Sequence, residues 1–143
     1  MIAYIDASVV LRIVLEQPSP LAEWDELEGG VSSPLLAIEC HRTLDRFWRE
    51  DRLDEAAFTA KRIEVDTIMR RLGVIPLRAP VLHAAAQPLP TILGTLDAIH
   101  LASAMVYRIV QPKDERPLLF ATHDDQLARA ARALNFDVLG VGA

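Results

Sequence analysis

Four acidic residues, spread along the chain, stand where a protein of alternating strands and helices collects its functional groups. They are Asp6, Glu39, Asp97 and Asp124. Asp6 directly follows the apolar run at residues 2–5, and Asp124 closely follows the apolar run at residues 118–121. Functional groups of a parallel α/β sheet lie just beyond the carboxyl ends of its strands. We therefore expect these two carboxylates at the same edge of one sheet.

The other two acids fall in predicted helices. Glu39 lies among apolar residues, a full turn or more from the start of its helix, and Asp97 lies in the first turn of another helix. Four carboxylates that converge on one edge repel each other unless a cation neutralises them. Oxygen ligands without a Cys or His cluster favour Mg²⁺ or Mn²⁺ over zinc. The pattern therefore predicts a Mg²⁺ site, with Mn²⁺ as an alternative ion.

Each acid also has a purely structural interpretation, and the sequence leaves the choice open. Asp6 and Asp124 are favoured capping residues at the starts of predicted helices. Glu39 is spaced to pair with Arg42 one turn further on. Asp97 would stabilise the positive end of its helix electrostatically.

Hydrophobic periodicity predicts the elements that position these acids. The predicted strands are the short apolar runs at residues 2–5, 31–32, 74–77, 118–121 and 136–141. The predicted helices cover residues 9–16, 20–28, 34–50, 55–72, 80–87, 96–110 and 124–134, and a polar turn covers residues 111–117. Strands that alternate with helices indicate a central parallel sheet covered on both faces, a three-layer α/β/α sandwich. The length of 143 residues suits a single domain, residues 1–143.

The ends of two predicted helices depend on particular residues. Ser19 is the expected N-cap of the second helix, and Gly29 with Gly30 is its expected end. Thr95 is the expected N-cap of the helix that carries Asp97.

Composition and charge narrow the class of protein. Hydrophobic residues make up 51% and charged residues 24% of the chain, as in an ordinary soluble globular protein. No apolar stretch is long enough to span a bilayer, and no basic region precedes the first apolar run, so we expect neither a membrane anchor nor a secretory signal. The only cysteine, Cys40, excludes an intrachain disulfide and fits a reducing cytoplasm. The net charge of -5 argues against a protein that coats nucleic acid non-specifically but allows a local basic groove.

Four segments resemble, in order and spacing, the successive motifs of PIN-domain proteins. The segments are Tyr-Ile-Asp-Ala-Ser at 4–8, Ile-Glu-Cys-His-Arg at 38–42, Leu-Asp-Ala-Ile-His-Leu-Ala at 96–102 and Thr-His-Asp-Asp-Gln-Leu at 122–127. The resemblance is greatest to the VapC-type toxins of bacterial toxin–antitoxin pairs, and it extends over nearly the whole chain. Residues 79–95, which include three prolines, are less similar.

The resemblance implies a Mg²⁺-dependent endoribonuclease in which the four acids form the catalytic and metal-binding site. It assigns supporting polar roles to Ser8 and Thr122. The sequence leaves open whether Asp124 or its neighbour Asp125 enters the site.

Roles within such a site follow from the residue types. We expect Asp6 and Asp97 to bind the metal directly. Glu39 and Asp124 would bind the metal, hold its water or assist proton transfer. His100 lies one turn after Asp97 and could act as a base or ligand, but we favour a structural, hydrogen-bonded role for it.

The resemblance also implies partners. The substrate would be RNA, and a toxin of this class is paired with a cognate antitoxin protein. Small PIN toxins form homodimers, and amphipathic helices here carry Trp24, Trp48 and Phe58, which one small core would not fully cover. We therefore expect a cytoplasmic homodimer.

Three arginines, Arg42, Arg46 and Arg49, recur on one face of the helix predicted at 34–50. One hypothesis is that they contact RNA phosphates or an acidic partner. The alternative is an ordinary solvated helix face.

Two other classes of protein use similar residues. A phosphoacceptor signalling module needs paired acids after its first strand and a lysine at the end of a late strand. Asp6 has no acidic neighbour, and neither Lys61 nor Lys113 ends a late strand. A non-catalytic PIN-like protein would bind metal or RNA without cleavage, and the intact acids at all four positions argue against it.

Overall fold

The computed structural model describes residues 1–112 and 116–142. In chain order, its elements are β1 (Ile2–Ile5), α1 (Ala7–Val14), the 3₁₀ turn η1 (Trp24–Glu26), β2 (Gly29–Ser32), α2 (Leu35–Arg49), α3 (Glu55–Arg71), β3 (Gly73–Val74), α4 (Ala79–Ala85), α5 (Thr95–Val110), β4 (Leu119–Ala121), α6 (Asp125–Ala133) and β5 (Val138–Leu139). The polar turn predicted at 111–117 lies partly outside the described residues. No helix within the described ranges is both long and apolar enough to cross a membrane.

The strands form one parallel sheet in the order β3-β2-β1-β4-β5. β1 lies at the centre, because it pairs with both β2 and β4. Ile5 is in register with Ala121, and the backbone N–H of Asp6 donates to the Ala121 carbonyl at 3.1 Å. The residues that follow β1 and β4 therefore emerge side by side at one edge of the sheet.

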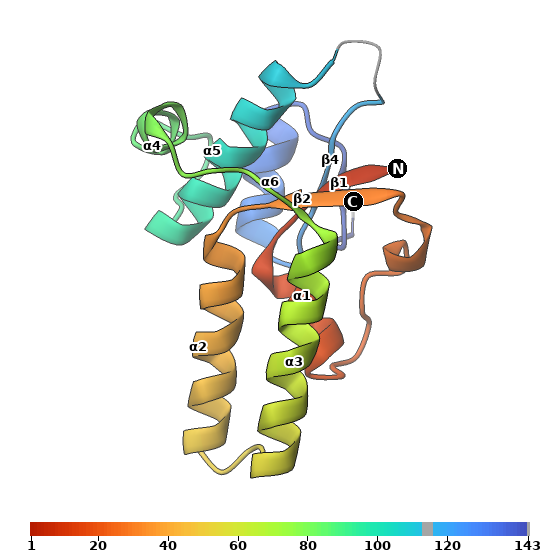
Figure 1. Cartoon of the computed structure of the whole chain (residues 1–143). Coiled ribbons are helices and arrows are strands. Elements are labelled where there is room, and N and C mark those ends of the chain that lie inside the picture. Colours follow the sequence, from red (N-terminus) through yellow and green to blue (C-terminus); the bar gives the residue numbers. More distant parts are fainter. Residues whose placement is uncertain (113–115, 143) are drawn as a thin grey trace.

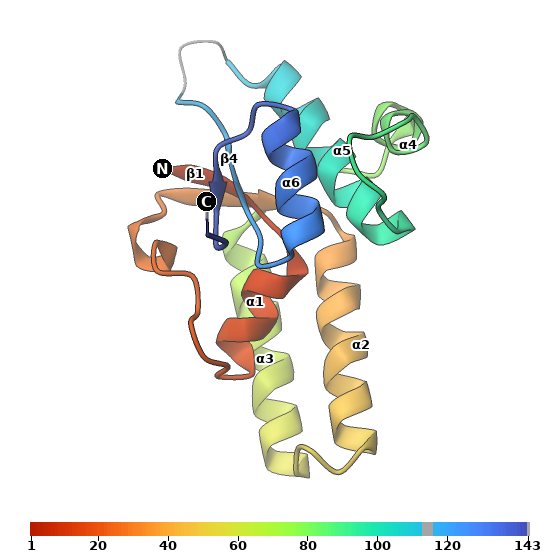
Figure 2. The ribbon, with the colours of Figure 1, turned by 180° about the vertical axis from the view of Figure 1, so that it is seen from behind.

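Helices cover both faces of the sheet. Successive residues of a strand point to opposite faces, so each face presents apolar side chains for helices to cover. Ala3 and Ile5 belong to the apolar cluster formed with α1, α2 and α3, whereas Tyr4 belongs to the cluster formed with α4, α5 and α6. Figures 1 and 2 show these two helical layers from opposite sides, with the sheet between them. The three-layer α/β/α sandwich predicted from the sequence is confirmed.

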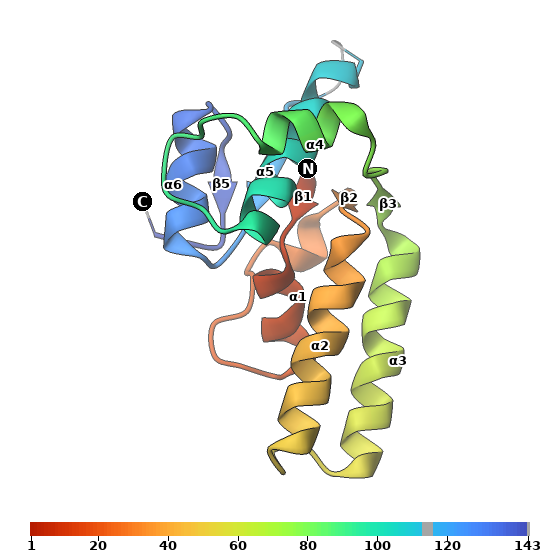
Figure 3. The same ribbon diagram turned by 90° about the vertical axis from the view of Figure 1, so that its left-hand side faces the viewer.

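Helices α2 and α3 form a long antiparallel hairpin that projects away from the sheet (Figure 3). Asp54 caps α3, since its carboxylate accepts the Ala57 N–H at 2.7 Å. Near the turn of the hairpin, the rings of Trp48 and Phe58 stack with centroids 4.8 Å apart. Because α2 starts beside the sheet, its first turns remain close to the strand ends (Figure 1).

The prediction of a helix at residues 20–28 is wrong. Ser19 has a left-handed φ of 56°, and its carbonyl accepts a hydrogen bond from Arg12 Nη1 at 3.1 Å, so the chain turns here instead of starting a helix. Only the short turn η1 forms in this segment. Leu21 and Trp24 pack as parts of a loop against the cluster of α1, α2 and α3. Apolar residues three apart therefore fit a loop that touches the core at intervals as well as a helix.

Two predicted helix ends also differ from the structure. Gly29 and Gly30 do not end a helix but belong to β2. A Cβ on Gly30 would lie 2.7 Å from Leu72 Cδ2, so the missing side chain lets the end of α3 approach the sheet. Thr95 is the first residue of α5, and Gly94 caps this helix without a side-chain hydrogen bond.

Candidate active site

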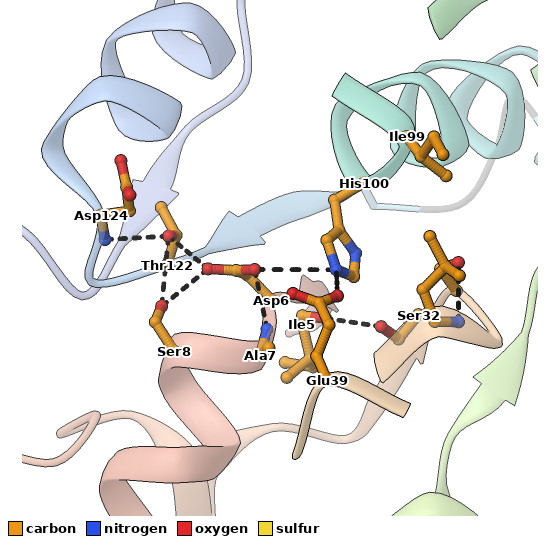
Figure 4. A network of polar contacts seen from close by, with 12 residues as sticks. Ile5, Asp6, Ala7, Ser8, Ser32, Glu39, Ile99, His100, Thr122 and Asp124 are labelled. Atoms are coloured by element: carbon orange, nitrogen blue, oxygen red, sulfur yellow. Dashed lines mark hydrogen bonds and ion pairs between the residues drawn. The ribbon is translucent and has the colours of Figure 1, made fainter. Parts of the chain in front are cut away.

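Asp6 lies at the centre of a polar network at the sheet edge (Figure 4). Its side chain is buried, with 4% of the residue exposed. One carboxylate oxygen accepts the Ala7 N–H at 2.7 Å, and the other accepts the hydroxyls of Ser8 at 2.7 Å and Thr122 at 2.8 Å. Asp6 therefore caps α1, as its structural interpretation predicts, and also faces the groups that follow β4.

The hydroxyls of Ser8 and Thr122 join the start of α1 to the loop between β4 and α6. Ser8 Oγ accepts the His123 N–H at 2.9 Å, while Thr122 Oγ1 accepts the Asp124 N–H at 3.0 Å. Both hydroxyls also donate to Asp6. These contacts hold the Asp6 carboxylate against the loop that follows β4.

Asp124 and Asp125 differ in their surroundings. The Asp124 side chain caps α6 by accepting the Leu127 N–H at 2.9 Å, and it is partly buried. Asp125 is exposed in the first turn of α6. The Asp124 charge acts on the Asp97 carboxyl strongly enough to raise its pKa. We therefore take Asp124, rather than Asp125, as the candidate site residue.

Glu39 and His100 meet on the other side of Asp6 (Figure 4). His100 is fully buried, and its Nε2–H donates to the Glu39 carboxylate. The same nitrogen lies 3.9 Å from an Asp6 carboxylate oxygen, and Nδ1 lies 2.6 Å from the Tyr4 hydroxyl. Burial alone lowers the pKa of His100, but the hydrogen bond to Glu39 and the nearby carboxylate charges raise it overall above its ordinary value.

The predicted pairing of Glu39 with Arg42 is not what the structure shows. Glu39 bonds to His100, and Arg42 instead lies 3.5 Å from Asp45 on the same helix. The His100 contacts also match the hydrogen-bonded role favoured for it from the sequence. The helix that carries Glu39 is thus linked to the helix that carries Asp97 through a buried ring.

Asp97 lies in the first turn of α5 and is partly buried. Burial, followed by the charges of Asp6 and Asp124, raises the pKa of its carboxyl to about 6. Glu39 adds to this effect, while His100 opposes it. The charges of three acids from widely separated parts of the sequence therefore act on the Asp97 carboxyl.

The donor set suits a hard divalent cation. All four acids offer carboxylate oxygens, which Mg²⁺ and Mn²⁺ prefer. The raised pKa of Asp97 indicates negative charge that a bound cation would offset. Among the residues that the structure describes, no three His, Cys, Asp or Glu side chains already form a metal-binding group. The residues thus fit a hard cation in the type of their oxygen donors and in charge.

Residues 3–133 match the family model of the PIN domain. The chain belongs to the PIN domain family. Two curated relatives from Mycobacterium tuberculosis align with nearly all of this PIN domain. Ribonuclease VapC47 (strain CDC 1551 / Oshkosh) is 27% identical over 147 residues, which cover 98% of this chain and 97% of the relative. Ribonuclease VapC35 is 30% identical over 146 residues, which cover 97% of this chain and 96% of the relative.

The three arginines predicted to contact RNA or a partner lie on the exposed surface of α2 in this PIN domain. Arg49 lies 3.2 Å from Asp45, and Arg46 lies 3.8 Å from Glu50. Arg42 also lies close to Asp45, at 3.5 Å. These intrahelical pairs are those of a solvated helix face, and they leave the guanidinium groups accessible to an anionic partner.

Sequence reasoning missed two residues of the site. Tyr4 is part of a short apolar run, and nothing in that run indicates a hydroxyl directed at His100. His123 is partly buried, and its Nδ1–H donates to the Gly140 carbonyl at 2.7 Å. Its position between Thr122 and Asp124 is the only sequence signal for such a role.

Proposed function

We propose that this PIN domain is a Mg²⁺-dependent endoribonuclease that acts in the cytoplasm as the toxin of a toxin–antitoxin pair. The observation that carries the proposal is the gathering of acids at one sheet edge. The Asp6 and Glu39 carboxylates flank the His100 ring, and the charges of Asp6 and Asp124 raise the pKa of Asp97. Mutually repelling carboxylates at one sheet edge form the kind of site that a divalent cation stabilises. The names of both relatives, which are ribonucleases, support RNA as the substrate.

In this proposal, Asp6 and Asp97 hold Mg²⁺ directly, and Glu39 and Asp124 complete the site. When bound, Mg²⁺ supplies positive charge that activates water for attack on the phosphodiester and stabilises the leaving oxygen. The chain itself orients the Asp6 carboxylate, because Ser8 and Thr122 donate to one of its oxygens. Glu39 or Asp124 would assist proton transfer, since each has carboxylate oxygen at the edge of the site.

Partners follow from the same proposal. A cognate antitoxin protein would hold the toxin inactive until it is needed. The arginines of α2 are the candidate contacts for RNA phosphates or for acidic residues of such a partner, because their charged ends are exposed. The net charge of -5 means that phosphate contacts must be local rather than spread over the surface.

The direct test is cleavage of RNA by the purified chain. We expect cleavage with Mg²⁺ or Mn²⁺, loss of cleavage in EDTA, and recovery when Mg²⁺ is restored. Sequencing the new RNA ends would define the substrate and the cleavage site. Cleavage that persists in EDTA after extensive dialysis would contradict the metal-dependent mechanism.

A cellular test addresses the toxin assignment. We expect expression of the chain alone to arrest growth, and co-expression of the product of a small adjacent gene to restore it. Unimpaired growth, at verified expression of folded protein, would count against the toxin role and leave the nuclease assay to judge the chemistry.

The alternative is a PIN-like protein that binds RNA or metal without cleavage. Such a protein would bind Mn²⁺ or RNA in the same experiments but leave the RNA intact. A phosphoacceptor module would instead become labelled by a small phosphodonor at Asp6.

A further inference from the structure

We propose that His100 and Tyr4 are positioning residues that hold the Glu39 carboxylate toward the other acids. The inference rests on the proposed function, because Glu39 is one of the acids to which that proposal assigns the metal site. It concerns a chain of contacts from the central strand β1, through α5, to α2. Each step of that chain is buried or nearly so.

The first contact is between His100 and Glu39. A carboxylate has no proton to give, so His100 Nε2–H is the donor and the Glu39 oxygen is the acceptor. The His100 side chain is fully buried, and the Glu39 side chain is 17% exposed. One Glu39 oxygen is therefore occupied by the ring, and the other is the one left to face a cation.

The second contact fixes the ring itself. Tyr4 OH lies 2.6 Å from His100 Nδ1. The hydroxyl donates to this nitrogen when the ring is neutral and accepts its N–H when the ring is protonated, so the contact holds the ring in both states. Tyr4 has no exposed surface, and its ring stacks on Phe120 with centroids 5.2 Å apart. With both nitrogens engaged, the imidazole has one orientation and one donor directed at Glu39. Hydrogen bonds of this kind set the orientation of metal ligands in many sites.

The third observation is the position of the ring between two acids. His100 Nε2 lies 3.9 Å from an Asp6 oxygen as well as in contact with Glu39. Without this N–H, repulsion from Asp6 would favour rotamers that turn the long Glu39 side chain away. The buried donor thus allows Glu39 and Asp6 to occupy the same edge.

The test uses two amides of different reach at position 100. In His100→Gln, the amide N–H takes the place of Nε2–H and still reaches Glu39. In His100→Asn, the shorter amide takes the place of Nδ1 and faces Tyr4 alone. We expect His100→Gln to bind Mn²⁺ nearly as the unmodified chain does, and His100→Asn to lose about 10- to 100-fold in Mn²⁺ affinity, as measured by the paramagnetic resonance signal of free Mn²⁺.

A double-mutant cycle shows whether the effect passes through Glu39. Glu39→Ala should weaken Mn²⁺ binding, and adding His100→Asn to Glu39→Ala should weaken it no further. Leu101→Ala is the control for loosened packing, because Leu101 is a fully buried neighbour on the same helix. It should lower the melting temperature while retaining Mn²⁺ affinity. Tyr4→Phe keeps the ring stacking and should give a smaller loss than His100→Asn.

Several outcomes would overturn the inference. They are equal Mn²⁺ affinity in His100→Gln and His100→Asn, additive losses in the cycle with Glu39→Ala, and an unmodified chain that binds no Mn²⁺. The failure of the proposed function looks different. In that case the unmodified chain binds Mn²⁺ and responds to the position-100 variants as expected, yet leaves RNA intact.

Discussion

Asp6 shows how one carboxylate serves the backbone and the site together. It accepts the Ala7 N–H that begins α1, the hydroxyl of Ser8 in the first turn of α1 and the hydroxyl of Thr122 directly after β4. These donors offset the cost of burying its charge at the sheet edge. Because both oxygens are held, Asp6 has little freedom to turn away from neighbouring carboxylates. The other acids must therefore adapt to its position.

Of the four acids, Asp97 is the one for which removal of the charge has the clearest expected effect on the stability of the fold. In the metal-free protein, its ionised form is destabilised by burial and by Asp6 and Asp124. Asp97→Asn removes this charge with little change of shape, so at pH 8 the metal-free variant should be more stable, by no more than about 1 kcal/mol because solvent screens a partly buried group. If Asp97 served only the helix terminus, stability should instead fall by about 0.3–1 kcal/mol. Thermal unfolding in EDTA distinguishes these outcomes, with exposed Asp137→Asn as the control.

The pH dependence of that difference follows from the direction of the shift. The folded pKa of Asp97 is raised from 3.8 to about 6, so ionised Asp97 destabilises the native state fully above the folded value. The destabilisation should shrink as the pH falls through 6 and vanish below 3.8. The stability gain of Asp97→Asn should therefore be present at pH 8 and absent at the acidic end. In Asp97→Asn, RNA cleavage should be lost and Mn²⁺ binding should be weakened at both ends of this pH range.

The adjacent acids at the start of α6 form a matched pair. Asp124 caps the helix and raises the Asp97 pKa, whereas Asp125 is exposed. Asn is also a good cap. Asp124→Asn should therefore keep the helix but reduce Mn²⁺ affinity and RNA cleavage, and Asp125→Asn should leave both nearly unchanged. Equal losses in the two variants would contradict the assignment of Asp124 to the site.

The contacts around His100 could not be predicted at the level of residues. Tyr4 and His100 are 96 positions apart, and Glu39 and His100 are 61 positions apart. Local patterns placed Asp6, Asp97 and Asp124 near helix starts or strand ends, because capping preference and the sheet edge are both visible in a short window. Which buried hydroxyl meets which ring nitrogen depends on how α2 and α5 pack across the sheet. That information is not in any one segment.

At the scale of elements, the starts of three helices lie at the acidic edge. Asp6 caps α1, Asp124 caps α6, and Asp97 lies in the first turn of α5. The positive end of a helix stabilises nearby negative charge. This arrangement partly offsets the repulsion among the acids, and it leaves the same edge attractive to a phosphate group.

The sequence predicted most elements because their ends are marked by local chemistry. Asp54 caps α3, and Asp6 and Asp124 cap α1 and α6, as the capping preference of Asp suggests. The helix predicted at 20–28 does not form, because its apolar residues can pack equally well as part of a loop. The left-handed conformation of Ser19 could not be predicted, because serine does not favour it. The glycines of β2 were wrongly predicted to end a helix, because the close approach of β2 to α3 is visible only in the tertiary structure.

The end of β5 provides a stability test for the loop that carries Asp124. Gly140 has a φ of 101°, and a Cβ there would lie 2.3 Å from the Thr122 carbonyl oxygen. Gly140→Ala should therefore destabilise the protein by about 1–3 kcal/mol, through backbone strain and collision. Gly142→Ala is the control, since nothing lies within 4 Å of its Cβ position. Chemical denaturation should show a loss for the first variant and little change for the second.

The whole molecule combines an acidic net charge with several exposed apolar side chains. The net charge is -5, so copies of the chain repel one another weakly at low salt. The exposed apolar residues with more than half of their surface accessible include Ile38, Ile63, Ile92, Ile109 and Val110. They lie on several helices and one loop, and a monomer would leave all of them in water.

We expect the chain to form a homodimer with two-fold symmetry. Of the aromatic residues that suggest it from the sequence, Trp24 and Phe58 pack partly against the core, and Trp48 remains 38% exposed. The expectation therefore rests more on the exposed aliphatic residues, because full burial of each side chain would stabilise the dimer by roughly 1.5–3 kcal/mol. Light scattering at micromolar concentration should give about twice the mass of one chain. A dimer held by apolar burial should persist or strengthen in 1 M salt, because screening reduces the repulsion between acidic copies. A monomer at low and high salt would contradict this prediction, and dissociation in salt would indicate an interface held by ion pairs instead.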